Sequence, residues 1–161
     1  MKNIYHFSVV LFFSLLTSSL FAQVTTTNAA PYNTAANLVN NVLMGQGVTA
    51  INVTSYGNTV QRGYFANGGA SIGLDSGVVL SSGSIMNIPT SSGPGASTAI
   101  ANGAGQGAGD ADLLSVAQSV PSLIGQFFSV NSTWDASVIE FDFVPLSDTV
   151  EFDYVFGSEE Y

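Results

Sequence analysis

The C-terminal part of the chain alternates apolar and polar side chains with a period of two. In the run 138–144, Ile139, Phe141 and Phe143 alternate with two acids, and the run 150–156 repeats the pattern. This alternation puts the aromatic side chains on one face of a β-strand and the acids on the other. We predict two strands here, joined either as a hairpin or by a sandwich crossover. The aromatic residues expected to face the core are Phe141, Phe143, Phe152, Tyr154 and Phe156.

Shorter β-rich pieces lie upstream, each bounded by Gly or Asn residues. They cover residues 48–54, 61–66 and 76–83. Short strands at close spacing are typical of an antiparallel sandwich or barrel and not of a parallel α/β sheet. The glycine-rich run 89–109 has few large apolar residues, which indicates a surface loop.

Two short helices are also predicted. Apolar residues at helical spacing in the run 34–44, with Asn33 or Thr34 as the N-cap, indicate an amphipathic helix. Asp110 is placed to cap a second helical turn, which we expect Pro121 to end. The predicted fold class is therefore mainly β: an antiparallel β-sandwich or jelly-roll-like domain with one or two short helices.

Residues 1–22 have the pattern of a secretory signal peptide. A single lysine precedes the apolar run 4–16, and the small residue Ala22 lies at its exit. The run is shorter than the roughly 18 residues that span a bilayer. We expect cleavage near Ala22 and a secreted or cell-surface protein, in which residues 23–33 form a lead-in segment and residues 34–161 form the β domain.

Beyond the predicted signal peptide, the chain is strongly acidic. Arg62 is its only Lys or Arg against eleven Asp and Glu, a net charge of 1 − 11 = −10. Neither a nucleic acid nor an anionic membrane surface is an expected partner, because both require positive counter-charge. There is no cysteine, and the one histidine, His6, precedes Ala22. Ser-His-Asp and Cys-His catalysis and histidine-ligated zinc are therefore excluded beyond Ala22, and carboxylate chemistry remains.

Several of the acids are candidate calcium ligands. Glu159 and Glu160 are adjacent, so on a strand one of them would point inward, where a carboxylate needs a partner. Calcium takes about six to eight oxygen ligands, and the chain is rich in such groups. The predicted metal ligands are Asp110, Asp112, Asp135, Glu140, Glu159 and Glu160. The alternative is that these acids cap a helix and form the solvated face of a sheet.

Four segments together resemble the choice-of-anchor L domain. They read G-L-D-S-G-V-V-L-S-S-G (73–83), G-D-A-D-L (109–113), W-D-A-S-V-I-E-F-D-F-V-P (134–145) and F-D-Y-V-F-G-S-E-E-Y (152–161). The resemblance implies a mostly β module of exported bacterial proteins, which differ from one another in their surface-sorting signals. In that family further strands follow S-E-E-Y, so the resemblance also implies a domain that is truncated here at its C-terminus.

Two classes of function stay open. The preferred hypothesis is a non-catalytic exported or cell-surface module, adhesive and stabilised by calcium, with extracellular glycans or surface proteins as partners. The alternative is a carbohydrate-active enzyme with paired carboxylates, drawn from Glu140, Glu159 and Glu160, or a glycan-binding module on the same scaffold. An enzyme would need two facing carboxylates in an open, aromatic-lined cleft, whereas calcium would need acids that converge on a closed oxygen cage.

Overall fold

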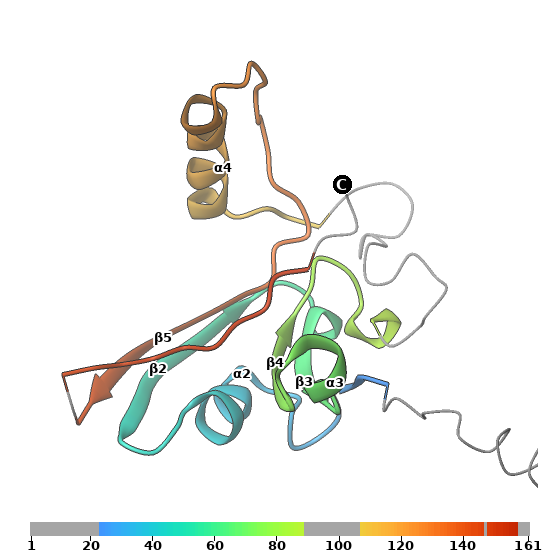
Figure 1. Ribbon diagram of the computed structural model, residues 1–161, viewed down its shortest axis with the longest axis vertical. Helices are drawn as coiled ribbons and strands as arrows, with labels where there is room; N and C mark the ends of the chain where they lie inside the picture. Colours follow the sequence, from blue (N-terminus) through green and yellow to red (C-terminus); the bar gives the residue numbers. More distant parts are fainter. Residues whose placement is uncertain (1–22, 89–106, 147, 158–161) are drawn as a thin grey trace, which may run out of the picture.

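The computed structural model describes residues 23–88, 107–146 and 148–157. Strands in these ranges form two antiparallel sheets (Figure 1). A three-stranded sheet has the order β1 (Thr25–Thr27), β3 (Arg62–Ala66) and β4 (Ser76–Leu80), and a two-stranded sheet pairs β2 (Val48–Tyr56) with β5 (Val138–Pro145). The predicted mainly β fold is confirmed. The segment expected as a lead-in contributes β1, which pairs with β3.

The helical elements are short. They are α2 (Ala35–Leu38), which continues into the π-helical turn η1 (Val39–Leu43), then the 3₁₀ turn η2 (Thr59–Gln61), α3 (Gly69–Ile72), the 3₁₀ turn η3 (Ile85–Asn87) and α4 (Ala111–Ile124). The helix predicted in the run 34–44 is confirmed, and Thr34 caps it, because its Oγ1 accepts a 3.2 Å hydrogen bond from the Asn37 backbone N–H.

The core lies where the first helix meets both sheets. The continuous α2–η1 segment contacts β2 of one sheet, and η1 also contacts β4 of the other. Leu38 and Val39 are fully buried there, as is Ile85 of η3. The apolar side chains of this helical segment therefore fill the space between the two sheets, as its apolar stripe predicts.

The β2–β5 ladder contains an irregularity at Asn52. Ile51 pairs with Asp142, the next pair is Thr54 with Glu140, and the register shifts between them. Asn52 has a φ of 55°, in the left-handed region that Asn tolerates better than most residues. Its side-chain N–H donates a 2.7 Å hydrogen bond across the ladder to the Asp142 carboxylate. This bond gives one acid of the tail a structural role.

The second predicted strand of the tail, residues 150–156, is absent from the structure. Residues 148–157 form no strand, and β5 pairs with β2 and not with this segment. Without a ladder partner the aromatic residues have no opposing layer: Tyr154 is 84% exposed and Phe156 is 85% exposed. The expectation that Phe143, Phe152, Tyr154 and Phe156 face the core is therefore wrong. Phe141 is half-buried, and Phe143 packs edge-on against Phe152 with ring centroids 6.5 Å apart.

The second helix is longer than predicted. Asp110 caps α4 as expected, because its Oδ1 accepts a 2.9 Å hydrogen bond from the Leu113 N–H. Pro121 does not end the helix: α4 runs through it to Ile124 and stops at Gly125, whose φ of 67° closes the last turn. Proline removes one backbone donor, and this helix tolerates that loss three residues before its end.

The predicted signal peptide and most of the predicted glycine-rich loop lie outside the described residues. Among the helices that the structure does describe, none has the length and apolar character needed to span a membrane.

Candidate functional site

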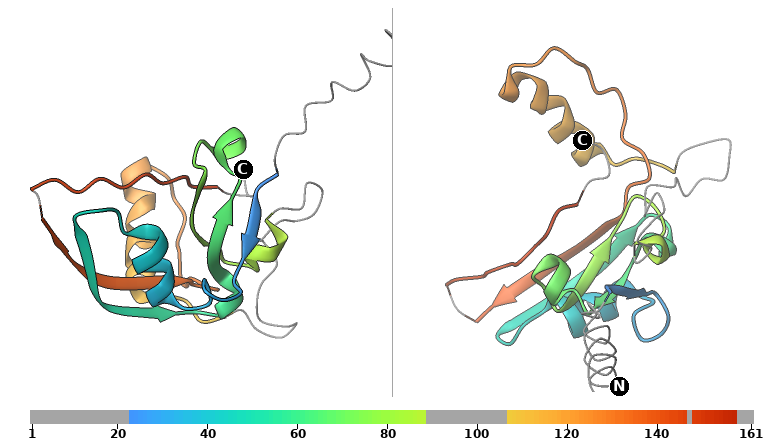
Figure 2. Two further views of the ribbon diagram at one scale, coloured as in Figure 1. Left: turned by 90° about the horizontal axis from the view of Figure 1, so that it is seen from below. Right: turned by 45° about the vertical axis from the view of Figure 1, so that its right-hand side comes forward.

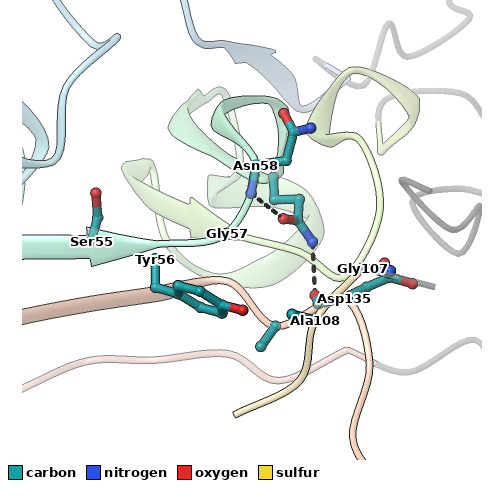
Figure 3. A pocket seen from close by; sticks show the side chains of 9 residues that line it. Ser55, Tyr56, Gly57, Asn58, Gly107, Ala108 and Asp135 are labelled. Atoms are coloured by element: carbon teal, nitrogen blue, oxygen red, sulfur yellow. Dashed lines mark hydrogen bonds between the residues drawn. The ribbon is translucent and has the colours of Figure 1, made fainter. Parts of the chain in front are cut away.

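A pocket of about 550 Å³ lies at the end of β2, where the first and second halves of the chain meet (Figure 3). Its walls come from the end of β2, the turn that leads into β3, and two segments on either side of α4. The described residues that line it are Ser55, Tyr56, Gly57, Asn58, Gln61, Gly107, Ala108, Asp135 and Ala136.

The two segments that flank α4 run side by side at the pocket. The Asp135 N–H donates to the Gly107 carbonyl oxygen, and the Ala136 N–H donates to the Ala108 carbonyl oxygen, each at 3.1 Å. The Thr133 hydroxyl both accepts from the Asp110 N–H and donates to the Asp110 carbonyl oxygen, each at 3.0 Å. These bonds join the two ends of the segment 107–136, called here the α4 excursion because it contains α4, and they fix one wall of the pocket.

Gln61 joins this wall to the β2–β3 turn. Its side chain is only 2% exposed. Its Oε1 accepts a 2.6 Å hydrogen bond from the Asn58 N–H, and its Nε2 donates to the carbonyl oxygens of Ser82 at 3.1 Å and Asp135 at 2.7 Å. A buried amide is stable only when its polar atoms are paired, and Gln61 meets that condition on three separate segments.

Gly57 permits the close approach of the two walls. Its φ is 96°, a backbone conformation that residues other than Gly rarely adopt. A Cβ atom at this position would collide with the Ala136 carbonyl oxygen. The turn after β2 can therefore lie against the 135–136 segment only because residue 57 has no side chain.

Asp135 is the one acidic residue among the described residues that line the pocket. The residue is 8% exposed and has a φ of 53°. Its Oδ1 accepts a 2.6 Å hydrogen bond from the Gly107 N–H. Arg62, the only Lys or Arg after Lys2, donates from Nη1 to the Gly57 carbonyl oxygen at 3.3 Å, and its Nε is buried without a hydrogen-bond partner. The partner that the structure gives the Asp135 carboxylate is thus a backbone N–H.

Tyr56 provides the aromatic wall. It is 46% exposed, and its ring extends toward Ala108 in Figure 3. Ser55 adds a hydroxyl at the far side, whereas the Asn58 amide is turned away from Asp135 and accepts from the Val60 N–H at 3.2 Å. The residues that line the pocket therefore include a half-exposed tyrosine, a serine and one largely buried aspartate, whose side chain points to Gly107 and away from Tyr56 in Figure 3.

The structure describes four of the six predicted metal ligands. Asp110 caps α4, Asp112 is exposed in the first turn of the same helix, and Glu140 is exposed on β5. Asp110 and Asp135 lie on the two segments that flank α4, and backbone hydrogen bonds join these two segments to each other. Glu159 and Glu160 lie outside the described residues. Within the described ranges, no three Asp, Glu, His or Cys side chains gather closely enough to hold a metal ion. Calcium binding stays a prediction.

Of the described residues that line the pocket, sequence reasoning singled out Asp135 alone, and it missed Tyr56, Gly57 and Gln61 among the others. One signal was present for Gln61. Asn58 followed three residues later by Gln61 matches a capping box, and the structure contains both reciprocal hydrogen bonds of that motif. The pattern would have predicted the turn, although not the additional bonds of Gln61 to residues far away in the sequence.

The described residues form a mainly β module with a pocket where the first and second halves of the chain meet. The model of the Choice-of-anchor L domain family matches residues 24–161. The chain therefore belongs to this family, and it is a cell-surface module of a surface-anchored protein. No curated protein and no solved structure gives a significant match.

Proposed function

We propose that this chain is a non-catalytic adhesion module that binds an extracellular glycan in the pocket between Tyr56 and Asp135. Membership of a surface-anchored family supports an encounter with extracellular ligands. The observation that carries the proposal is that a half-exposed tyrosine, Tyr56, and a largely buried aspartate, Asp135, line the same pocket.

The chemistry of this pair suits a sugar. A pyranose has an apolar face of C–H groups and an edge of hydroxyl groups. The face packs against an aromatic ring, and a hydroxyl donates to a carboxylate in a charge-assisted hydrogen bond. The volume of about 550 Å³ lies within the range of about 300–1,000 Å³ that is typical of small-ligand pockets. One or two sugar units of a longer glycan would fit.

The pocket supports binding better than hydrolysis. Glycoside hydrolases ordinarily use two carboxyl groups about 5 to 9.5 Å apart. Asp135 is the only carboxylate among the described residues that line the pocket, and Glu140 is exposed on β5 and is not among them. A single carboxylate can orient a hydroxyl group, but it cannot serve as both acid and nucleophile.

A glycan array tests the proposal directly. A protein of residues 23–161 is labelled and compared with its Tyr56→Ala variant and with Tyr154→Ala, a matched control whose ring is exposed outside the pocket. We expect selective binding of one glycan class, loss of that binding in Tyr56→Ala, and retention in Tyr154→Ala. Equal signals from both variants, no bound glycan at all, or release of shortened glycan products would each contradict the proposal.

A further inference from the structure

The three-stranded sheet includes a strand that lies close to the predicted signal peptide. Gln23, the first residue that the structure describes, is exposed, and β1 begins two residues later at Thr25. β1 pairs antiparallel with β3, with Thr25 opposite Ala66 and Thr27 opposite Tyr64, and Figure 2 shows it in blue at the edge of the sheet. Loss of a few residues from Gln23 onward would therefore remove an edge strand.

β1 is also tied to the core. The Thr26 hydroxyl donates a 2.7 Å hydrogen bond to the carbonyl oxygen of Ile85, whose side chain is fully buried. A Cβ atom at Gly63 would collide with the Thr27 carbonyl oxygen, so β1 lies close against β3. Without β1, the outer side of β3 would present unpaired backbone groups. The fold therefore depends on residues near the start of the described chain, and chain ends are where proteolysis concentrates.

The residue next to the expected cleavage site has its own chemistry. Cleavage after Ala22, which lies outside the described residues, makes Gln23 the first residue of the exported chain. An α-amine loses its proton near neutral pH, so part of it is then a neutral nucleophile. In a glutamine at the first position, this nitrogen reaches the amide carbon of its own side chain by closing a five-membered ring.

We infer that Gln23 is converted to pyroglutamate after cleavage. The α-nitrogen forms a bond to Cδ, the bond from Cδ to Nε2 breaks, and Nε2 leaves as ammonia with a proton from the α-amine. The reaction needs no oxidant or other co-reactant, and the exposure of Gln23 ahead of β1 leaves room for it. It depends on the expected cleavage and not on the glycan pocket.

The modification would protect the edge strand. The lactam has neither a charge nor a primary amine, and aminopeptidases act on a free α-amine. A chain that begins with pyroglutamate therefore keeps residues 25–27 and their pairing with β3.

The first test measures the mass of the exported protein. Residues 1–161 are expressed in a bacterial host that exports them, beside Gln23→Asn, and each product is incubated at neutral pH and analysed by intact-mass and N-terminal peptide mass spectrometry. Asn is the matched control, because its shorter side chain would have to close a four-membered ring. We expect residues 23–161 less one molecule of ammonia for the unaltered protein, and no such loss at residue 23 of Gln23→Asn. A free amine on Gln23 after the incubation, or a product that begins at another residue, would overturn the inference.

The second test measures protection. Both products are treated with an aminopeptidase, and their masses and melting temperatures are compared. We expect the unaltered protein to keep both, and Gln23→Asn to lose N-terminal residues and to melt at a lower temperature as trimming passes Thr25. Equal trimming of the two proteins, or trimming of Gln23→Asn that stops before Thr25, would overturn the protective role, since in the second case β1 would protect itself.

Discussion

The side-chain amide of Gln61 donates a 2.7 Å hydrogen bond to the backbone carbonyl oxygen of Asp135, a residue 74 positions further along the chain. This bond fixes the 135–136 segment against the turn after β2, and Asp135 is held at the wall of the pocket as a consequence. The geometry of the proposed ligand site thus depends on a side chain that does not itself need to touch a ligand.

Replacement of Gln61 by Ala should destabilise the protein. Three hydrogen bonds are lost, and buried groups on three segments are left without partners. We expect the free energy of unfolding to fall by about 3 kcal/mol, measured by chemical denaturation. Gln126→Ala, at an exposed position after α4, is the matched control and should change stability by less than about 0.5 kcal/mol. Similar losses in the two variants would contradict the role given to Gln61.

Replacement of Gly57 by Ala should also destabilise the fold. The new Cβ would collide with the Ala136 carbonyl oxygen, and alanine is strained at a φ of 96°. The expected loss is about 2 kcal/mol or more, seen as a lower melting temperature. Gly45→Ala is the control, because its Cβ meets no atom within 4 Å and its φ is not positive. A Gly57→Ala protein as stable as Gly45→Ala would show that the two walls can separate freely.

Calcium is expected to raise the melting temperature more than sodium at matched ionic strength. A bound ion that relieves repulsion among the acids stabilises the folded state by about 2.7 kcal/mol at a hundredfold excess over its dissociation constant. Asp112→Asn and Glu160→Gln should each remove most of this difference, and Asp153→Asn, in the exposed tail, should not. Equal shifts with either salt, unaffected by these substitutions, would indicate general screening of surface acids instead.

The strands were predictable wherever local pattern and tertiary environment agree. β2, β3, β4 and β5 follow the predicted β-rich runs closely, because each is bounded by turn residues and paired in an antiparallel sheet. The run 150–156 has an equally regular alternation, yet it forms no strand, since among the described residues no ladder partner lies beside it. Alternation shows which face each side chain would take, but a strand also requires a neighbouring strand.

The pocket was less predictable for a related reason. Asp135 was singled out as a candidate ligand on its residue type alone, and the structure places it in the pocket with a hydrogen bond to Gly107. Its neighbour across the pocket, Tyr56, is about 80 positions away in the sequence, and no local pattern encodes their proximity. Asp110 shows the opposite case, since its role as a helix N-cap depends only on the next three residues and was predicted correctly.

The most direct measurement of the glycan-binding claim is the affinity of Asp135→Asn for the glycan identified on the array, determined by titration calorimetry beside Asp153→Asn. Asn tolerates the φ of 53° at position 135, and its Oδ1 can still accept from the Gly107 N–H, so the substitution removes the charge and preserves the fold. We predict a dissociation constant at least about tenfold higher for Asp135→Asn, a loss of about 1.4 kcal/mol, and no change for Asp153→Asn. Equal affinity of Asp135→Asn and the unaltered protein would contradict it.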